Sequence, residues 1–301
     1  MQRSRKIYSL WLSVPFLLLL PMAAGAAEDS FDSAGVPIHY TDMGGDGEPV
    51  VLVHSYTSSS DMWSKAGFEP SDDFRFIALD VRGHGQSGQP EGDEAYGAEM
   101  AEDVVRLMDH LDLDDAHLAG YSMGAEIALK VATEYPERVS SLVVGGSGWS
   151  PAEAYEVYAF AAMGLEEAAT LGESITAMMP TEVPVEQIDF LLGSMEQHGI
   201  DPDYAGTAGL ASVGRTMNAI IPLTEAAVAS IDVPVLGIAS ENDSELPNIE
   251  RLDGVIEDFE LVLIPAGPTG DQSLDHLGAT QDPLFHESIV DFLSEHSELD
   301  T

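Results

Sequence analysis

The stretch Gly120-Tyr121-Ser122-Met123-Gly124 decides how the rest of the chain is interpreted. An apolar run at 116–119 precedes it, and apolar residues at helical spacing follow it over 125–132. G-x-S-x-G between a strand and a helix is typical of a sharp turn that lifts a serine hydroxyl above the end of the strand. A side chain at either glycine would collide with neighbouring chain in such a turn. The pattern therefore predicts that Ser122 is a nucleophile, for which the chain must also supply a base and a carboxylate.

Apolar runs bounded by breakers alternate with helical patterns on both sides of this stretch. Strands separated by helices indicate an α/β fold, with a mostly parallel, twisted sheet covered by helices on both faces. The site of such a sheet lies at the carboxyl ends of its strands, where His54, Arg82, Ser122 and Gly145 are found. We expect strands at 35–40, 49–53, 74–79, 116–119, 139–144, 233–239 and 261–264, and helices at 99–113, 125–132 and 284–293.

The pattern changes between 149 and 230. Strand signals vanish there, and helical stretches rich in Ala, Met and Glu are separated by prolines. We predict a helical cap insertion at 149–230 over the site, with the α/β core formed by 27–148 and 231–301. The methionines of the insertion fit either an apolar pocket roof or ordinary core, and we favour core because methionine at helical spacing more often has that role.

The first 26 residues have the pattern of a signal peptide. Arg3, Arg5 and Lys6 precede an almost wholly apolar stretch at 7–22, and Ala24-Gly25-Ala26 offers a small-residue cleavage site. The apolar stretch is short and contains two prolines, which disfavours a spanning helix. We predict cleavage near Ala26 and export to the periplasm or the exterior, without stable membrane insertion afterwards.

Acidic residues dominate the composition. The 301-residue chain has 53 Asp and Glu against 11 Lys and Arg, which gives a formal net charge of -42. Such a surface repels nucleic acid and anionic lipid headgroups, so neither is an expected partner. The acids are scattered, which favours a solvated surface, as in a high-salt habitat, over a cation-binding site. Cysteine is absent, which excludes disulfides, thiol chemistry and thiolate metal sites.

A base and a carboxylate follow Ser122 in the chain. Asp243 comes after the strand expected at 233–239, and His276 comes after the last expected strand. The order serine, aspartate, histidine is the one that a strand-turn-helix nucleophile requires. Glu241 is a competing carboxylate, but we favour Asp243 as the group that orients the imidazole. We expect His276 to lie in a loop directly after the last strand, unlike the other histidines.

Two backbone N–H groups should stabilise the oxyanion of the intermediate. The N–H of Met123 follows the nucleophile directly, and the loop after His54 should provide the second, which we assign to Tyr56. We interpret His54 as a structural histidine that shapes this loop. The run Gly83-His84-Gly85-Gln86-Ser87-Gly88 fits a dinucleotide fingerprint, but Pro90 follows where that fingerprint needs a helix, so we interpret it as a tight loop.

These features together resemble the α/β-hydrolase superfamily, specifically its cap-bearing, esterase-like members. The resemblance implies that Ser122, Asp243 and His276 are nucleophile, orienter and base, with no organic cofactor and no metal. Relatives usually carry glycine where this chain has Ser55, and they reach the histidine by a shorter loop than 265–275. The resemblance rests on Val51-Leu52-Val53-His54, on 80–87, on 120–124, on Asn242-Asp243 and on His276.

Together with the predicted signal peptide, the resemblance implies a secreted serine hydrolase that cleaves a carboxylic ester through an acyl-enzyme. Its expected partner is a small-molecule ester with an apolar part. A serine nucleophile counts against haloalkane dehalogenase and epoxide hydrolase chemistry, whose relatives use aspartate. A lactonase, a carbon–carbon hydrolase, a perhydrolase and a non-catalytic ligand-binding protein on the same fold remain as alternatives.

Overall fold

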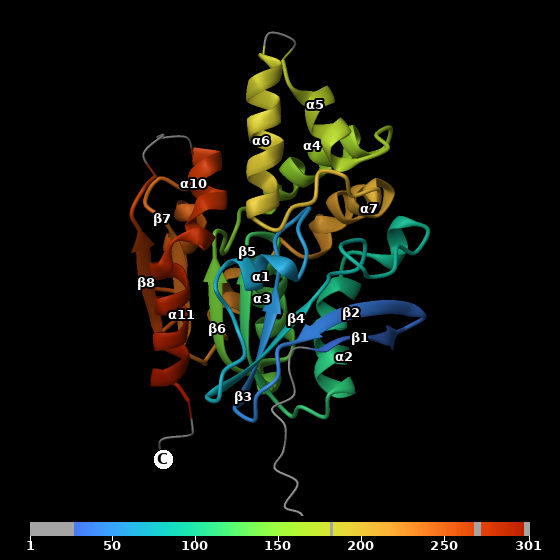
Figure 1. Ribbon diagram of the computed structural model, residues 1–301. Helices are drawn as coiled ribbons and strands as arrows, with labels where there is room; N and C mark the ends of the chain where they lie inside the picture. The colour runs from blue at the N-terminus through green and yellow to red at the C-terminus, as the bar shows by residue number, and fades with distance from the viewer. Residues whose placement is uncertain (1–26, 181–182, 268–271, 298–301) are drawn as a thin grey trace, which may run out of the picture.

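In the computed structural model, residues 27–180, 183–267 and 272–297 are described, so the predicted signal peptide lies outside them. An eight-stranded sheet in the order β1-β2-β4-β3-β5-β6-β7-β8 forms the centre of the molecule (Figure 1). Only β2 runs antiparallel to its neighbours β1 and β4, so the predicted α/β class is confirmed. The strands are β1 (Ala27–Ser33), β2 (Val36–Asp42), β3 (Glu48–Val53), β4 (Phe74–Leu79), β5 (Ala116–Tyr121), β6 (Val139–Gly145), β7 (Val235–Ser240) and β8 (Phe259–Ile264).

Helices cover both faces of this sheet, as the strand–helix alternation predicted. Helices α2 and α3 pack in one apolar core, and α1 and α11 pack in the other. The helices are α1 (Asp61–Lys65), α2 (Glu99–His110), α3 (Met123–Glu134), α4 (Tyr155–Leu165), α5 (Leu171–Met178), α6 (Val185–Gln197), α7 (Thr207–Thr216), α8 (Glu225–Val228), α9 (Leu246–Glu250), α10 (Gln272–Gly278) and α11 (Pro283–Glu295).

Strand β3 shows why its sequence is a continuous apolar run. Val51 and Val53 point into the core that contains α2 and α3, while Val50 and Leu52 point into the core that contains α1 and α11. All four side chains are fully buried. Because successive strand residues face opposite sides, only a strand covered on both faces needs apolar residues at every position. The parallel pairing of β3 with β4 and β5 then brings their carboxyl ends to one edge.

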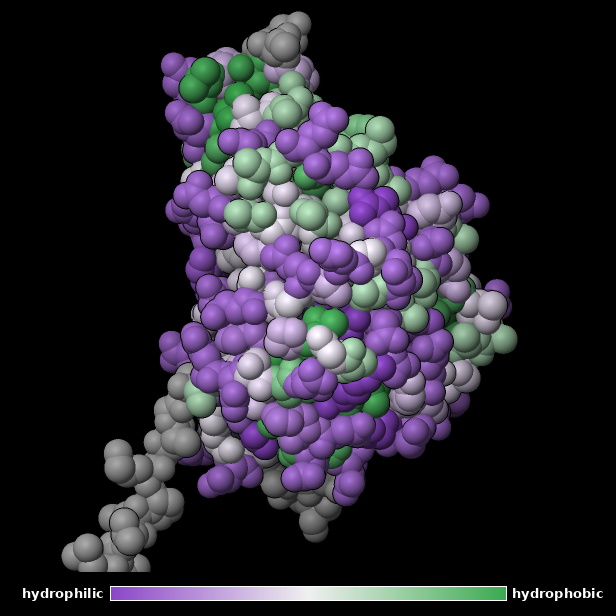
Figure 2. All heavy atoms as spheres, turned by 90° about the vertical axis from the view of Figure 1, so that its right-hand side faces the viewer, coloured by the Kyte–Doolittle hydropathy of each residue, from purple (hydrophilic) through white to green (hydrophobic). Residues whose placement is uncertain are grey.

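The segment predicted as a cap contains α4 to α8. Helices α4, α5, α6 and α7 lie above the sheet in Figure 1, and they share a small apolar cluster of their own. Met195 and Met217 are buried in apolar clusters, whereas Met163 and Met178 are exposed. Figure 2 shows a mostly hydrophilic face of the molecule, as the acid-rich composition leads one to expect.

Two elements differ from the expectation. Strand β1 was not predicted, because its sequence is polar and only Phe31 and Ser33 are buried. It pairs with β2 through the Ala34–Gly35 turn, where both residues have positive φ, so backbone pairing at the sheet edge forms it rather than an apolar pattern. The expectation that His276 lies in a loop was wrong, since His276 belongs to α10. Across the described ranges, no helix combines the length and apolar character needed to cross a membrane.

Candidate active site

The turn between β5 and α3 holds Ser122 in an unusual backbone conformation. Ser122 has φ 55° and ψ -117° and precedes the first residue of α3. A non-glycine residue in such a region costs about 1–3 kcal/mol, so the surrounding structure must impose it. A Cβ on Gly120 would lie 2.1 Å from the Gly124 carbonyl oxygen, and a Cβ on Gly124 would lie 2.1 Å from the Val53 carbonyl oxygen. Both glycines are therefore required by close approach of neighbouring backbone.

The structure brings Ser122, His276 and Asp243 together from three separate parts of the chain. The Nε2 atom of His276 lies 3.2 Å from the Ser122 hydroxyl, and its Nδ1 atom lies 2.8 Å from Oδ2 of Asp243. Asp243 is buried, whereas the rival Glu241 is exposed. With Nδ1–H donating to Asp243, Nε2 can accept the serine proton, which is the arrangement that activates a hydroxyl.

Further contacts hold the imidazole and its carboxylate in place. The second oxygen of Asp243 accepts a 2.9 Å hydrogen bond from the N–H of Glu245. The Tyr121 hydroxyl, from the residue before the nucleophile, donates to the backbone carbonyl of His276. Asp275 accepts hydrogen bonds from the Asn242 side chain and the Gly267 N–H, at 2.7 and 2.9 Å. These contacts give α10 a defined position after the long loop, and the sequence offered no signal for Tyr121 or Asp275.

The two predicted oxyanion donors lie where the loop after β3 meets the start of α3. In the described part of the chain, no group accepts a hydrogen bond from the backbone N–H of Tyr56 or of Met123. A Cβ on Gly124 would also lie 2.7 Å from the His54 carbonyl oxygen, which shows how closely the loop approaches the helix N-terminus. The Tyr56 hydroxyl donates to the Leu210 carbonyl at 2.7 Å and so ties this loop to α7.

Ser55 does not need a backbone conformation that only glycine adopts readily. Among the described non-glycine residues, positive φ occurs in this loop at Thr57, with φ 64°, and not at Ser55. His54 shapes the loop: its Nδ1 donates to the Ser55 carbonyl at 2.7 Å, and its Nε2 accepts from the Val81 N–H at 3.0 Å. Burial lowers the pKa of His54, which keeps this histidine neutral. The serine at position 55 therefore fits the loop without rearranging it.

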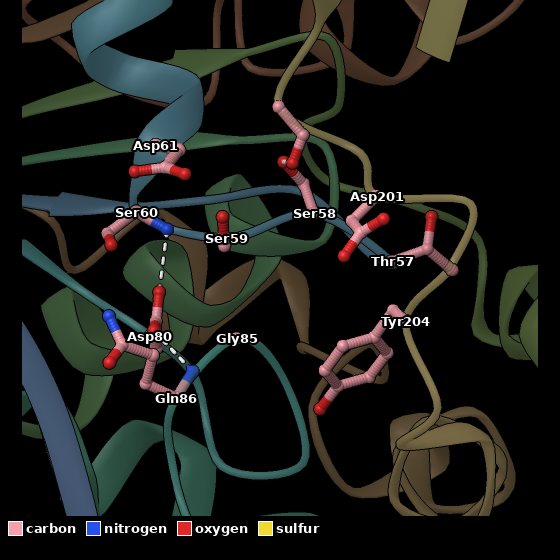
Figure 3. A pocket seen from close by; sticks show the side chains of 11 residues that line it. Thr57, Ser58, Ser59, Ser60, Asp61, Asp80, Gly85, Gln86, Asp201 and Tyr204 are labelled. Atoms are coloured by element: carbon pink, nitrogen blue, oxygen red, sulfur yellow. Dashed lines mark hydrogen bonds between the residues drawn. The ribbon is translucent and has the colours of Figure 1, made fainter. Parts of the chain in front are cut away.

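Asp80 fixes the two loops behind the oxyanion segment (Figure 3). Its Oδ1 accepts from the Ser60 N–H at 2.7 Å, and its Oδ2 accepts from the Gln86 N–H at 2.8 Å. Burial disfavours its charge, but hydrogen bonds from His39 and these amides hold the pKa of Asp80 well below its usual range. A Cβ on Gly85 would lie 2.2 Å from Oδ2, so the glycine-rich run is a tight loop that wraps a carboxylate. The neighbouring cavity of about 220 Å³ contains neither Ser122 nor His276.

A cavity of about 320 Å³ opens beside Ser122 and His276. Tyr56 and Tyr158 line it, together with two carboxyl side chains, Glu126 and Glu245. Glu126 lies one helical turn after the nucleophile. The sequence did not point to it, because a spacing of four residues from Ser122 indicates only a shared helix face and no chemical role. No group of three or more His, Asp or Glu side chains among the described residues is arranged to hold a metal ion.

Comparison with known proteins agrees with this architecture. The profile of the alpha/beta hydrolase fold family matches residues 48–166. The chain is 28% identical over 270 residues to "Putative carbamate hydrolase RutD" from Variovorax paradoxus, which covers 86% of this chain and 97% of that protein. A crystal structure of a hydrolase from Pseudomonas aeruginosa superposes with a TM-score of 0.69 at 25% identity and covers 90% of this chain and 99% of that one.

Higher identity occurs over a shorter stretch. The chain is 39% identical over 123 residues to the dihydrolipoyllysine-residue acetyltransferase component of the acetoin cleaving system from Pseudomonas putida. That match covers 40% of this chain but only 32% of the relative, so it concerns about a third of the larger protein.

Proposed function

We propose that this chain, which belongs to the α/β-hydrolase superfamily, is a serine hydrolase that cleaves carboxylic esters through an acyl-enzyme on Ser122. The observation that carries the proposal is the continuous chain of hydrogen bonds from Asp243 through His276 to Ser122. An isolated serine hydroxyl is a weak nucleophile, and a base oriented by a buried carboxylate is what activates it. The adjoining cavity gives a small-molecule substrate room beside the hydroxyl.

The proposed reaction has two stages that use the same groups. Ser122 Oγ attacks the ester carbonyl carbon while His276 Nε2 takes the hydroxyl proton, and the carbonyl oxygen becomes an oxyanion held by the N–H groups of Tyr56 and Met123. When the carbon–oxygen bond to the alcohol breaks, His276 returns the proton to the leaving alkoxide. His276 then deprotonates a water molecule that attacks the acyl-enzyme, and collapse of the second oxyanion releases the acid and regenerates Ser122.

The proposal is tested by turnover of nitrophenyl esters with acyl chains of graded length, measured at low and high salt. We expect steady hydrolysis preceded by a burst of about one nitrophenol per protein molecule, because acylation and deacylation are separate steps. The length of acyl chain that gives the highest kcat/KM then reports the size of the cavity. Absence of turnover from folded protein at every chain length and salt concentration would favour the alternatives of a lactonase, a carbon–carbon hydrolase or a non-catalytic binding protein.

We also propose that the protein is exported, with residues 1–26 removed. The proposal rests on the basic start, the apolar stretch and the small-residue site read from the sequence. The intact mass of protein recovered from the periplasm or medium of a secreting bacterial host should correspond to a chain that begins at Ala27. Recovery of the full-length chain from the cytoplasm alone would contradict export.

A further inference from the structure

A buried carboxyl group lines the cavity beside the nucleophile without a part in the reaction described above. Glu126 is 4% exposed. Its Oε1 accepts hydrogen bonds from the hydroxyls of Ser147 and Ser150 at 3.1 and 2.9 Å, and its Oε2 accepts one from the Tyr158 hydroxyl at 3.0 Å. Two donors fill the lone pairs of Oε1, whereas a carboxylate oxygen with one donor can accept another. Oε2 therefore retains capacity for a further partner.

Burial makes the ionised form of Glu126 unfavourable unless a nearby cation or hydrogen-bond donor stabilises the charge. Burial raises the pKa of Glu126 to about 7, even though three hydroxyls donate to it and favour its ionised form. A clamp between α3 and α4 would not require a charged group. A glutamine oxygen could accept from the two serine hydroxyls, and its NH2 group could donate to the Tyr158 hydroxyl oxygen. A buried carboxylate is stabilised most when a cation or a strong hydrogen-bond donor contacts its remaining lone pairs.

The surroundings of Glu126 match the chemistry that recognises organic cations. Glu245 lines the same cavity and adds a second carboxyl group. The rings of Tyr56 and Tyr158 also line it, with centroids 5.4 Å apart in an edge-to-face arrangement. Aromatic faces beside carboxylates are favourable sites for ammonium groups. The formal net charge of -42 further raises the local concentration of cations around the molecule.

We infer that Glu126 and Glu245 form a cation subsite, so that the preferred substrate is an ester that carries an ammonium group near the scissile carbonyl. This inference rests on the proposed ester hydrolysis and specifies its substrate class. The ammonium group would lie against Oε2 of Glu126 and the tyrosine rings while the carbonyl carbon meets Ser122. Glu126 acts in this scheme as a specificity determinant and takes no proton from the reacting atoms.

The test compares two esters of equal shape, acetylcholine and 3,3-dimethylbutyl acetate, which differ by the positive charge. We expect the wild-type kcat/KM to be at least about tenfold higher for the cationic ester, and Glu126→Gln to remove most of that preference. Glu245→Gln should reduce the ratio by a smaller factor and provides a second variant if Glu126→Gln fails to fold. Glu241→Gln is the matched control, because Glu241 is an exposed acid outside the cavity and should leave the ratio unchanged.

The ratio of the two kcat/KM values should also depend on pH. The ionised form of Glu126 binds the cation, so the preference should rise as pH increases through about 7 and then level off. The titratable groups that line the described part of the cavity with Glu126 are Tyr56 after β3, Tyr158 from α4, Glu245 after β7 and His276 from α10. The pKa of Tyr158 is raised by burial and by Glu126, so this phenol stays neutral near pH 7. The change in the ratio that Glu126→Gln removes is therefore the part that belongs to Glu126.

Separate readouts distinguish failure of this inference from failure of the proposed function. Labelling of Ser122 by a fluorophosphonate reports the nucleophile independently of any cation. Equal wild-type kcat/KM for the two esters, or a preference that Glu126→Gln leaves intact, would overturn the cation subsite. If neither ester is cleaved, calorimetry with choline on the Ser122→Ala protein decides: the subsite predicts binding that Glu126→Gln weakens at least about tenfold, and absence of binding would refute it.

Discussion

Replacing Ser122 by alanine is expected to lower kcat for a nitrophenyl ester by about five to six orders of magnitude. The change removes the atom that forms the acyl-enzyme, so only the oxyanion donors and substrate binding continue to assist hydrolysis by water. The fold should persist, because the Ser122 hydroxyl contributes its hydrogen bond to His276 while the turn is imposed by the glycines around it. Circular dichroism and thermal unfolding of the same preparation check this point.

Ser294→Ala is the control for this substitution. Ser294 is an exposed serine on α11, and its hydroxyl donates only to the Val290 carbonyl. Its loss should leave kcat within about twofold of wild type, as expected for surface substitutions. Undiminished activity of Ser122→Ala would show that another residue is the nucleophile.

Asp243→Asn is expected to lower kcat by about 10⁴-fold at neutral pH. An asparagine amide turned toward His276 donates to Nδ1, so the proton moves to Nε2 and that nitrogen no longer accepts from Ser122. The volume of the side chain hardly changes, and the amide oxygen can still accept from the Glu245 N–H, so the geometry should survive. Rates of ester hydrolysis by the variant and the wild-type protein provide the measurement.

The competing carboxylate provides the comparison for that variant. Glu241→Gln alters an exposed side chain two residues away and should change kcat by no more than a few fold. If instead Glu241→Gln abolished activity and Asp243→Asn did not, the assignment of the orienting carboxylate would be reversed.

The sheet was predictable because its strands are local patterns. Strands buried on both faces appear as uninterrupted apolar runs, as β3 does, and their mostly parallel direction followed from alternation with helices. Strand β1 could not be predicted in this way, since AEDSFDS carries little apolar pattern and is held by pairing with β2. The helical character of the segment around His276 was also hidden, because Asp275 in the first turn of α10 is held by Gly267 and by Asn242, which lies far away in the chain.

Some residues of the site could be identified from local sequence patterns, and others only from contacts between distant parts of the chain. Ser122, Asp243 and His276 could be named from a motif and from their order behind predicted strands. Glu126 could not, because its burial depends on Ser147, Ser150 and Tyr158, which approach it only when the chain between β6 and α4 folds over α3. The backbone conformation of the loop at Ser55 could likewise not be predicted, since its positive φ falls at Thr57.

The proposed reaction requires that Ser122 is a nucleophile activated by His276 and Asp243. The most direct measurement is the mass of the folded, wild-type protein after exposure to a fluorophosphonate, followed by peptide mapping of the modified site. We predict one adduct per chain, located on Ser122, and its loss in His276→Ala, because the hydroxyl reacts only when a base accepts its proton. An adduct on a different residue, or none on folded protein, would show that Ser122 is not the activated nucleophile.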